Sequence, residues 1–149
     1  MLNLFDSHAF HMGGDEVNMN CYKSSPEIQE YFKNVNLLEV SNQDIIELWV
    51  KFQTRAADLV QKFKKLPIIL WTSALTSHKN VTKYLPPSEY IIQFWDKLHS
   101  KSLTNLLNKG YKVIVSNYDA LYLDCGYANW VTNGTNWCSP YKGEFKYIF

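Results

Sequence analysis

Residues 68–71, Ile68-Ile69-Leu70-Trp71, form a continuous apolar run that follows Pro67. The run has the length of a β-strand, and an unbroken apolar run is typical of a strand that is covered on both faces. Tyr90-Ile91-Ile92-Gln93-Phe94-Trp95 repeats the pattern about twenty residues later. Strands of this kind belong to parallel sheets, so we expect an α/β protein.

The segments around these runs alternate between helix and strand patterns. Residues 9–12 predict a short strand, and Ser24-Ser25-Pro26-Glu27 is a helix start with proline in the first turn. Residues 102–109 predict a helix closed by Gly110, followed by a strand at 113–115, whereas residues 118–149 predict a long loop region. The strongest pattern is a helix that begins at Ser41 or Asn42 and runs to about residue 65, with one apolar face formed by Ile45, Leu48, Trp49, Phe52, Ala56, Leu59, Val60 and Phe63.

Polar and aromatic residues follow the predicted strands where each strand ends. They are Asp15-Glu16, Trp71-Thr72, Trp95-Asp96 and Asn117-Tyr118-Asp119. Four alternating strands suit a doubly wound sheet or a (β/α)8 TIM barrel, and a barrel builds its active site from the C-terminal ends of its strands. A whole barrel takes about 250 residues, so the pattern predicts one partial domain over residues 1–149, roughly the second half of a barrel and incomplete at both ends.

Composition and charge exclude several classes of protein. The chain has 149 residues, 46% of them hydrophobic, with 15 basic and 14 acidic side chains. No basic run is present that would follow a phosphate backbone, so we expect no nucleic-acid partner. The apolar runs are far shorter than the about 20 residues that span a bilayer, so we expect no membrane span.

Three cysteines and two glycosylation sequons, at Asn80 and Asn133, favour a secreted or lysosomal protein. Three reduced thiols in a cytosolic protein are the alternative. Residues 1–10 contain neither a basic nor an apolar segment, so we expect any signal peptide to lie outside this chain.

The stretch His11-Met12-Gly13-Gly14-Asp15-Glu16-Val17 predicts acid/base chemistry. The glycines permit a sharp turn, so the two carboxylates can project into a cleft. Acidic residues at a helix N-terminus would be the structural alternative, but the next predicted helix begins too late. We expect no metal site with His11, because no second ligand cluster is present.

Five aromatic residues at strand ends or in loops are the second signal. A flat ring can cover the apolar face of a sugar while carboxylates bind its hydroxyl groups. Rings that pack beneath a loop are the alternative, which we prefer for Trp130. The set is Trp71, Trp95, Tyr122, Trp130 and Trp137.

These motifs together resemble the β-N-acetylhexosaminidases of glycoside hydrolase family 20, close to the insect members that degrade chitooligosaccharides. The resemblance covers nearly the whole chain, with several motifs in the same order. They are the acidic stretch above, Cys21-Tyr22-Lys23-Ser24-Ser25-Pro26-Glu27-Ile28, Leu70-Trp71-Thr72-Ser73, Ile92-Gln93-Phe94-Trp95, and Ser116-Asn117-Tyr118-Asp119-Ala120-Leu121-Tyr122-Leu123-Asp124-Cys125-Gly126.

The resemblance implies an exo-acting, retaining hydrolase of terminal, non-reducing N-acetylhexosamine residues, without a cofactor. Glu16 would be the general acid and later the base. Asp15 would orient the 2-acetamido group of the substrate, which forms an oxazolinium intermediate, and Tyr122 would donate a hydrogen bond to that group. Such substrate-assisted catalysis needs no nucleophile from the enzyme.

The resemblance also implies the substrate-binding residues. Trp71 and Trp95 would enclose the sugar, Asp124 would accept hydrogen bonds from its outer hydroxyls, and His11 would orient the acidic loop. Trp137, with Asn136 beside it, would stack on the aglycone. Cys125 and Cys138 would be bridged, with two free thiols as the alternative, and Cys21 would pair with a cysteine upstream. The partner would be an N-acetylhexosamine-terminated oligosaccharide, and a homodimer is conceivable at full length.

The chain departs from the family pattern in what it lacks. A sugar-binding arginine, a His/Asp pair that supports the acid and the last strand of the barrel are absent, and residues 3–9 differ from the usual approach to the acidic motif. We therefore expect the chain by itself to fold poorly or to be inactive. The alternative function is a truncated, inactive sugar-binding fragment.

Overall fold

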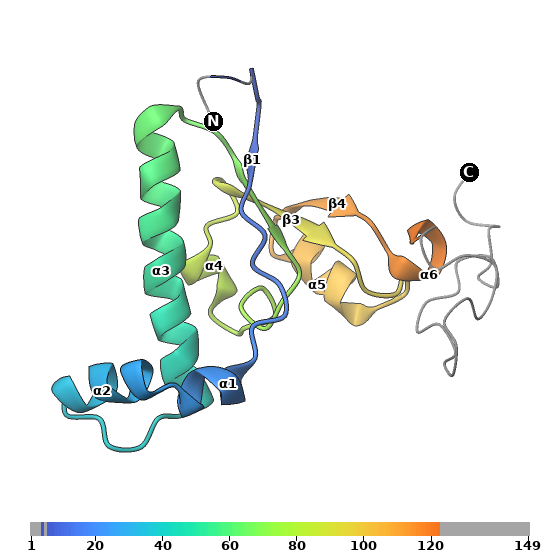
Figure 1. Ribbon diagram of the computed structural model, residues 1–149. Helices are drawn as coiled ribbons and strands as arrows, with labels where there is room; N and C mark the ends of the chain where they lie inside the picture. Colours follow the sequence, from blue (N-terminus) through green and yellow to red (C-terminus); the bar gives the residue numbers. More distant parts are fainter. Residues whose placement is uncertain (1–3, 5, 123–149) are drawn as a thin grey trace, which may run out of the picture.

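The computed structural model describes residues 4 and 6–122, which form a parallel sheet with helices beside it (Figure 1). The fold is therefore of the predicted α/β class. The strands are β1 (Phe10–His11), β2 (Ile68–Trp71), β3 (Tyr90–Phe94) and β4 (Lys112–Val115). The helices are α1 (Met19–Ser24), α2 (Pro26–Asn34), α3 (Asn42–Phe63), α4 (Val81–Tyr84), α5 (Lys101–Asn108) and α6 (Tyr118–Leu121).

The four strands pair in chain order, β1-β2-β3-β4, and every pairing is parallel. Phe10 pairs with Ile68, Ile68 pairs with Tyr90, and Ile91 pairs with Lys112. Because parallel strands end at the same edge of a sheet, the segments after the four strands all emerge at one edge. Strand β1 contributes only two residues to the sheet.

Helix α3 begins where the sequence predicted. Ser41 is its N-cap, and Ser41 and Asp44 form a capping box in which each side chain accepts a backbone N–H of the other residue. The hydrogen bond from the Ser41 hydroxyl lowers the pKa of the Asp44 carboxyl. The helix has 22 residues, and among the residues that the structure describes no helix is both long and apolar enough to cross a membrane.

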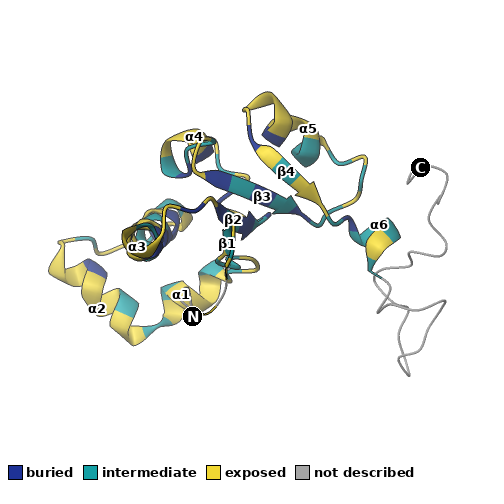
Figure 2. Cartoon of the chain, turned by 90° about the horizontal axis from the view of Figure 1, so that it is seen from above, coloured by how far each residue is buried: buried dark blue, intermediate teal, exposed yellow. Residues whose placement is uncertain are grey.

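The buried face of α3 is rotated from the predicted one. Phe52, Leu59 and Phe63 were predicted to face the core, but they are 68%, 53% and 73% exposed. The buried residues are instead Ile45, Ile46, Trp49, Gln53, Ala57 and Val60. Figure 2 shows the resulting division of α3 into a buried side toward the sheet and an exposed side.

The core lies between the sheet and the helices. Ile68, Leu70, Ile92 and Phe94 alternate along β2 and β3 and are at most 2% exposed. The residues between them are only half-buried, so the prediction that these strands are covered on both faces is wrong for the described residues. One face of the sheet is packed, and the opposite face is partly open.

Three short helices differ from the predictions. Helices α1 and α4 were not predicted, and α6 forms within the predicted loop region. Helix α5 begins after Ser100, whose side chain accepts the N–H of Ser102. It ends at Asn108, and Gly110 follows with a φ of +84° and an N–H that donates to the Leu107 carbonyl at 2.9 Å.

Tyr111 connects the end of α5 to the core. Its hydroxyl donates to the Leu85 carbonyl at 2.6 Å, and its side chain is 4% exposed. Burial raises the pKa of Tyr111 to about 12, because the charged phenolate loses solvation there. The folded state therefore favours the neutral form of Tyr111 over the phenolate.

Candidate active site

The turn after β1 carries the two acidic residues. It stays beside β2, because Trp71 donates its N–H to the Gly13 carbonyl at 3.0 Å. Gly13 and Gly14 have φ values of +67° and +83°, and Glu16 has φ +48°. A residue with a side chain in this left-handed region costs about 1–3 kcal/mol, and such residues cluster at functional sites. The backbone thus holds Glu16 in an unusual conformation next to the sheet.

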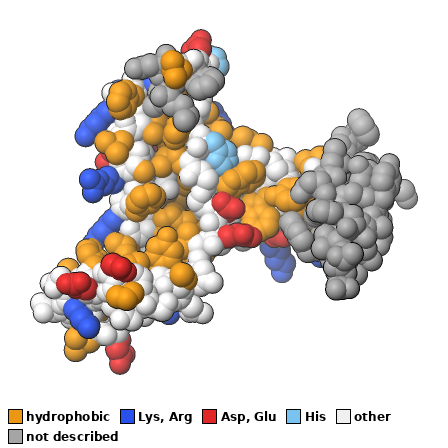
Figure 3. All heavy atoms as spheres, viewed as in Figure 1, with side chains coloured by type: hydrophobic (Ala, Val, Ile, Leu, Met, Phe, Trp, Pro, Cys, Tyr) orange, Lys and Arg blue, Asp and Glu red, His pale blue; other side chains and the backbone are white. Residues whose placement is uncertain are grey.

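One cavity brings together five of the predicted site residues. It has a volume of about 580 Å³ and is lined by Asp15, Glu16, Trp71, Trp95 and Tyr122. They come from the turn after β1, the end of β2, the position after β3 and the position after α6. In Figure 3, acidic side chains lie against hydrophobic surface over the middle of the molecule. The combination of carboxylates, a phenol and indole rings suits a sugar.

The two tryptophans of this cavity are held by their neighbours. Trp95 donates its indole N–H to the Thr72 carbonyl at 2.9 Å, and the Thr72 side chain accepts the Trp95 backbone N–H at 3.3 Å. The Trp71 ring lies 4.9 Å from the His11 ring, measured between centroids. Both indoles are therefore oriented before a ligand binds.

Asn117 and Asp119 connect the segments after β3 and β4. Asn117 is 4% exposed, and its amide donates to the Asp119 carboxylate at 2.6 Å. The same carboxylate accepts the N–H of Leu98 at 3.3 Å. Asp119 therefore supports the loops that flank the cavity, and it is not among the residues that line it.

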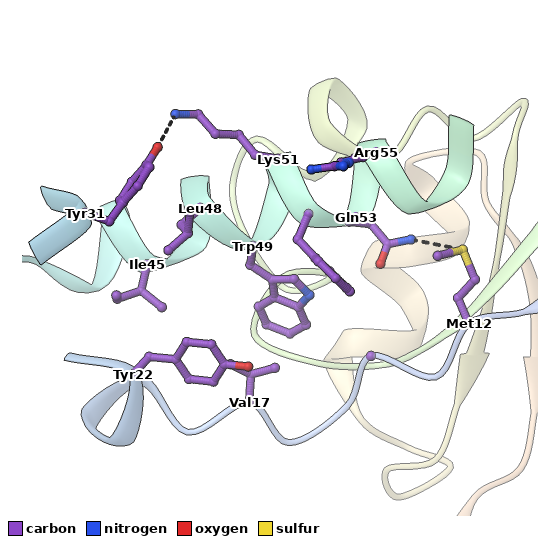
Figure 4. A pocket seen from close by; sticks show the side chains of 12 residues that line it. Met12, Val17, Tyr22, Tyr31, Ile45, Leu48, Trp49, Lys51, Gln53 and Arg55 are labelled. Atoms are coloured by element: carbon purple, nitrogen blue, oxygen red, sulfur yellow. Dashed lines mark hydrogen bonds between the residues drawn. The ribbon is translucent and has the colours of Figure 1, made fainter. Parts of the chain in front are cut away.

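A second large cavity lies along α3 and has a different lining (Figure 4). Its volume is about 590 Å³, and Trp49, Val17 and Tyr22 form part of an apolar wall. Lys51 and Arg55 contribute positive charge, and no carboxylate is among its lining residues in the described part of the chain. The lining of this cavity thus has no carboxyl group among the described residues, whereas the cavity with Glu16 has two.

Other predicted site residues lie outside this cavity or outside the described residues. His11 contacts the Trp71 ring and accepts the Gly13 N–H on Nδ1 at 3.0 Å. Asn80 is exposed at the N-cap of α4, and its side chain makes no capping hydrogen bond there. Cys21 is exposed and unbridged within the described residues. Asp124, Cys125, Trp130, Asn133, Asn136, Trp137 and Cys138 lie outside the described residues.

No group of three or more His, Cys, Asp or Glu side chains is arranged to hold a metal ion within residues 4 and 6–122. The two carboxylates of the cavity are adjacent in the chain, and no third ligand of this kind joins them in that part of the protein.

Sequence reasoning assigned no role to the residues that support the cavity. Gln93 and Ser116 form a hydrogen-bonded chain with His11, and Thr72 holds Trp95. A signal for Gln93 was present, because an amide interrupts the otherwise apolar end of β3. Thr72 and Ser116 carried no comparable signal, since short hydroxyl side chains are common after strands.

Comparisons with known proteins identify the family of the chain. The sequence model described as glycosyl hydrolase family 20, catalytic domain, matches residues 1–147. A chitooligosaccharidolytic beta-N-acetylglucosaminidase of Ostrinia furnacalis is 48% identical over 149 aligned positions, which cover 98% of this chain and 25% of the relative. The protein of the same name from Bombyx mori has the same identity and coverage.

A more distant relative is the beta-hexosaminidase subunit beta of Felis catus. It is 30% identical over 140 positions, which cover 93% of this chain and 23% of the relative. The chain thus spans about a quarter of the length of the curated relatives that it matches. Because the family model matches nearly all of its residues, the chain belongs to glycosyl hydrolase family 20 and carries sequence of its catalytic domain.

Proposed function

We propose that this chain carries the acid/base part of an exo-acting β-N-acetylhexosaminidase active site. The substrate would be an oligosaccharide, such as a chitooligosaccharide or a glycan, that ends in a non-reducing N-acetylhexosamine. The observation that carries the proposal is the single cavity lined by Asp15, Glu16, Trp71, Trp95 and Tyr122. The names of the insect relatives support the substrate class.

The reaction assigns a different role to each carboxylate. Glu16 protonates the glycosidic oxygen as the bond to the leaving sugar breaks, and it later removes a proton from the attacking water. Asp15 orients the N–H of the substrate's 2-acetamido group, whose oxygen attacks the anomeric carbon and retains the configuration overall. Tyr122 donates a hydrogen bond to the acetamido group, and Trp71 and Trp95 cover the apolar face of the sugar.

The architecture fits a section of a TIM barrel. The four strands are parallel and consecutive, and the cavity lies at the edge where they end. The packed sheet face would be the outer, helix-covered wall, and the partly open face would be the barrel interior. We infer that residues 1–149 are one part of such a catalytic domain, roughly its second half. A secreted or lysosomal location is supported by the exposed sequon at Asn80.

A chimera tests this proposal directly. The chain replaces the 149 aligned positions of the Ostrinia furnacalis relative, and hydrolysis of an aryl N-acetylglucosaminide is measured. Glu16→Gln should lower kcat about 10²–10⁴-fold, because the general acid is lost. Glu89→Gln, which changes an exposed glutamate before β3, is the matched control and should leave kcat unchanged.

The leaving group gives a sharper result. A dinitrophenolate departs without protonation, so Glu16→Gln should lower kcat/KM, which reports the first step of the reaction, much less for the dinitrophenyl glycoside than for chitobiose. Equal losses on both substrates would contradict the role of Glu16 as the acid. An active chimera with an unaltered kcat after Glu16→Gln would refute the assignment of the site.

Sugar binding without turnover is the second candidate function. It is supported by the same cavity, whose carboxylates, phenol and indole rings could bind a sugar whether or not the sugar is cleaved. Calorimetry of the isolated chain with chitobiose, followed by chromatography of the sugar, separates the two functions. Binding with intact chitobiose would support the second candidate, and release of N-acetylglucosamine would exclude it.

A further inference from the structure

A line of polar side chains crosses the sheet next to the candidate active site. His11 at the end of β1 lies with Nε2 3.1 Å from Gln93 Oε1 in β3. Gln93 in turn donates from its Nε2 to the Ser116 hydroxyl, just after β4, at 2.7 Å. The amide of Gln93 thus connects the two outer strands of the sheet by side-chain hydrogen bonds.

The hydrogen bonds of His11 determine which ring nitrogen carries the proton. The Gly13 N–H donates to Nδ1 at 3.0 Å, so Nδ1 must be unprotonated and the proton of a neutral ring must lie on Nε2. Nε2–H can then donate to Gln93 Oε1. A flipped Gln93 amide would place its NH2 group against the Nε2–H of His11, so that two donors would face each other. The flipped amide could also no longer donate to the Ser116 hydroxyl.

These bonds act on the turn that carries the acids. Gly13 and Gly14 adopt left-handed φ values of +67° and +83°, and the hydrogen bond to Nδ1 closes the turn at its first glycine. The His11 ring also contacts the ring of Trp71, which lines the cavity. The orientation of one imidazole therefore affects both the acidic turn and one aromatic wall.

We propose that Gln93 is a positioning residue of this site. Its amide oxygen holds His11 in the Nε2–H tautomer, so that Nδ1 remains an acceptor for Gly13 and keeps Asp15 and Glu16 at the cavity. The structural part of this inference concerns the tautomer and the turn. Its catalytic consequence rests on the proposed function.

The chain contains a matched control for this arrangement. His78 accepts the N–H of Asn80 on Nδ1 at 3.1 Å, and its Nε2 lies 2.9 Å from Gln43 Oε1. His11 and His78 therefore have the same two kinds of partner. Each contacts a backbone N–H two residues later and a glutamine on another element. His78 and Gln43 are not among the residues that line the candidate active site.

Ring-nitrogen NMR tests the tautomer in the chain, which has four histidines. We expect His11 and His78 both to show the Nε2–H pattern. Gln93→Met should shift the His11 ring nitrogens and the Gly13 amide and leave His78 unchanged, and Gln43→Met should do the reverse. A proton on Nδ1 of His11, or no change at His11 and Gly13 in Gln93→Met, would overturn the inference.

Kinetics of the chimera provide a test that does not depend on how the chain folds by itself. Gln93→Met should lower kcat by on the order of 10²-fold through misplacement of the acid, with little change in KM. Gln43→Met should match the unmutated chimera in both kcat and KM.

The kinetic outcomes separate the two proposals. An active chimera in which Gln93→Met and Gln43→Met have the same kcat would refute the positioning role. An unmutated chimera without activity would count against the proposed function, and the NMR measurement would still decide the tautomer and its dependence on Gln93.

Discussion

Gly14→Ala in the chimera tests whether the conformation of the acidic turn matters for catalysis. Gly14 has φ +83°, and a Cβ added there would lie 3.5 Å from Leu70 Cδ2 and 4.0 Å from Trp49 Cζ2. Both distances are ordinary van der Waals contacts, so the substitution causes no collision. The cost comes from the backbone, because a left-handed conformation costs a residue with a Cβ about 1–2 kcal/mol.

The turn can respond to this cost in two ways. If the substituted alanine escapes the strain by rotation of φ to negative values, the peptide planes on either side turn and displace the carboxylates of Asp15 and Glu16. If the conformation persists, the folded state loses about 1–2 kcal/mol, a factor of about 5–30 in the folding equilibrium. We expect a partial rotation of φ, which displaces the carboxylates and lowers kcat, while the strain that remains lowers the free energy of unfolding.

Gly110→Ala is the matched control. Gly110 has φ +84° with nothing within 4 Å of an added Cβ, and it lies after α5, away from the cavity. The two variants should lower the Tm of the chimera to a similar extent, because each forces one alanine into the same region of φ. Only Gly14→Ala should also lower kcat. Equal kcat values for the two variants, at equal Tm, would refute the reasoning.

Three further predictions use thermal unfolding of the chimera. Ser41→Ala should lower the free energy of unfolding by about 0.5–2 kcal/mol. Because Ser41 lowers the pKa of Asp44, this part of the stabilisation is complete above the ordinary value of 3.8 and is lost as the pH falls through the lowered value, so the difference between the variant and its parent should narrow at acidic pH. Tyr111→Phe leaves the Leu85 carbonyl without its donor and should lower the free energy of unfolding by about 1–3 kcal/mol. Since the pKa of Tyr111 is raised from 10.0 to about 12, the stabilisation by Tyr111 should be present below pH 10 and disappear as the pH rises toward 12. Phe52→Ser should change stability by at most about 0.5 kcal/mol, because the side chain is 68% exposed. The first prediction would be contradicted by a Tm difference for Ser41→Ala that is independent of pH. The second would be contradicted by a Tyr111→Phe variant as stable as the parent, and the third by a Phe52→Ser variant that unfolds several degrees earlier.

The sequence predicted the strands well, because their pattern is local and strong. Ile68–Trp71 and Tyr90–Phe94 are strands as expected, and their parallel pairing agrees with the continuous apolar runs. Ser41 is the cap of α3, because a serine followed three residues later by an acidic residue is a local hydrogen-bonding signal. Such features depend on a few neighbouring residues and can be read without the rest of the fold.

The face of α3 could not be predicted in the same way. Leu59 and Phe63 continue the apolar period, yet they are exposed, whereas the polar Gln53 is 2% exposed. Gln53 is accommodated because its amide lies 3.5 Å from the Met12 sulfur. Periodicity describes the spacing of apolar side chains, but the neighbouring elements decide which side of a helix is covered.

The candidate site was predictable where residue chemistry alone was informative. Glu16 and Trp95 were identified from their residue type and their place after a strand, and both line the cavity. The role of Gln93 could not be predicted, because it depends on a histidine 82 positions away in the chain. Side chains that orient others carry a weak sequence signal, since amides and hydroxyls make hydrogen bonds throughout a protein.

The pairing of β1 with β2 has a consequence for the order of folding. Phe10 pairs with Ile68, 58 positions later, whereas Ile68 and Tyr90 are separated by 22 positions. Closing the longer loop costs about 0.9 kcal/mol more in chain entropy, and β1 has only two residues to offset it. We therefore expect β2, β3 and β4 to associate first and β1 to join last and to open first. The amides of residues 10–16 should then exchange with solvent sooner than those of β2 and β3, so that loss of the acidic turn precedes loss of the sheet.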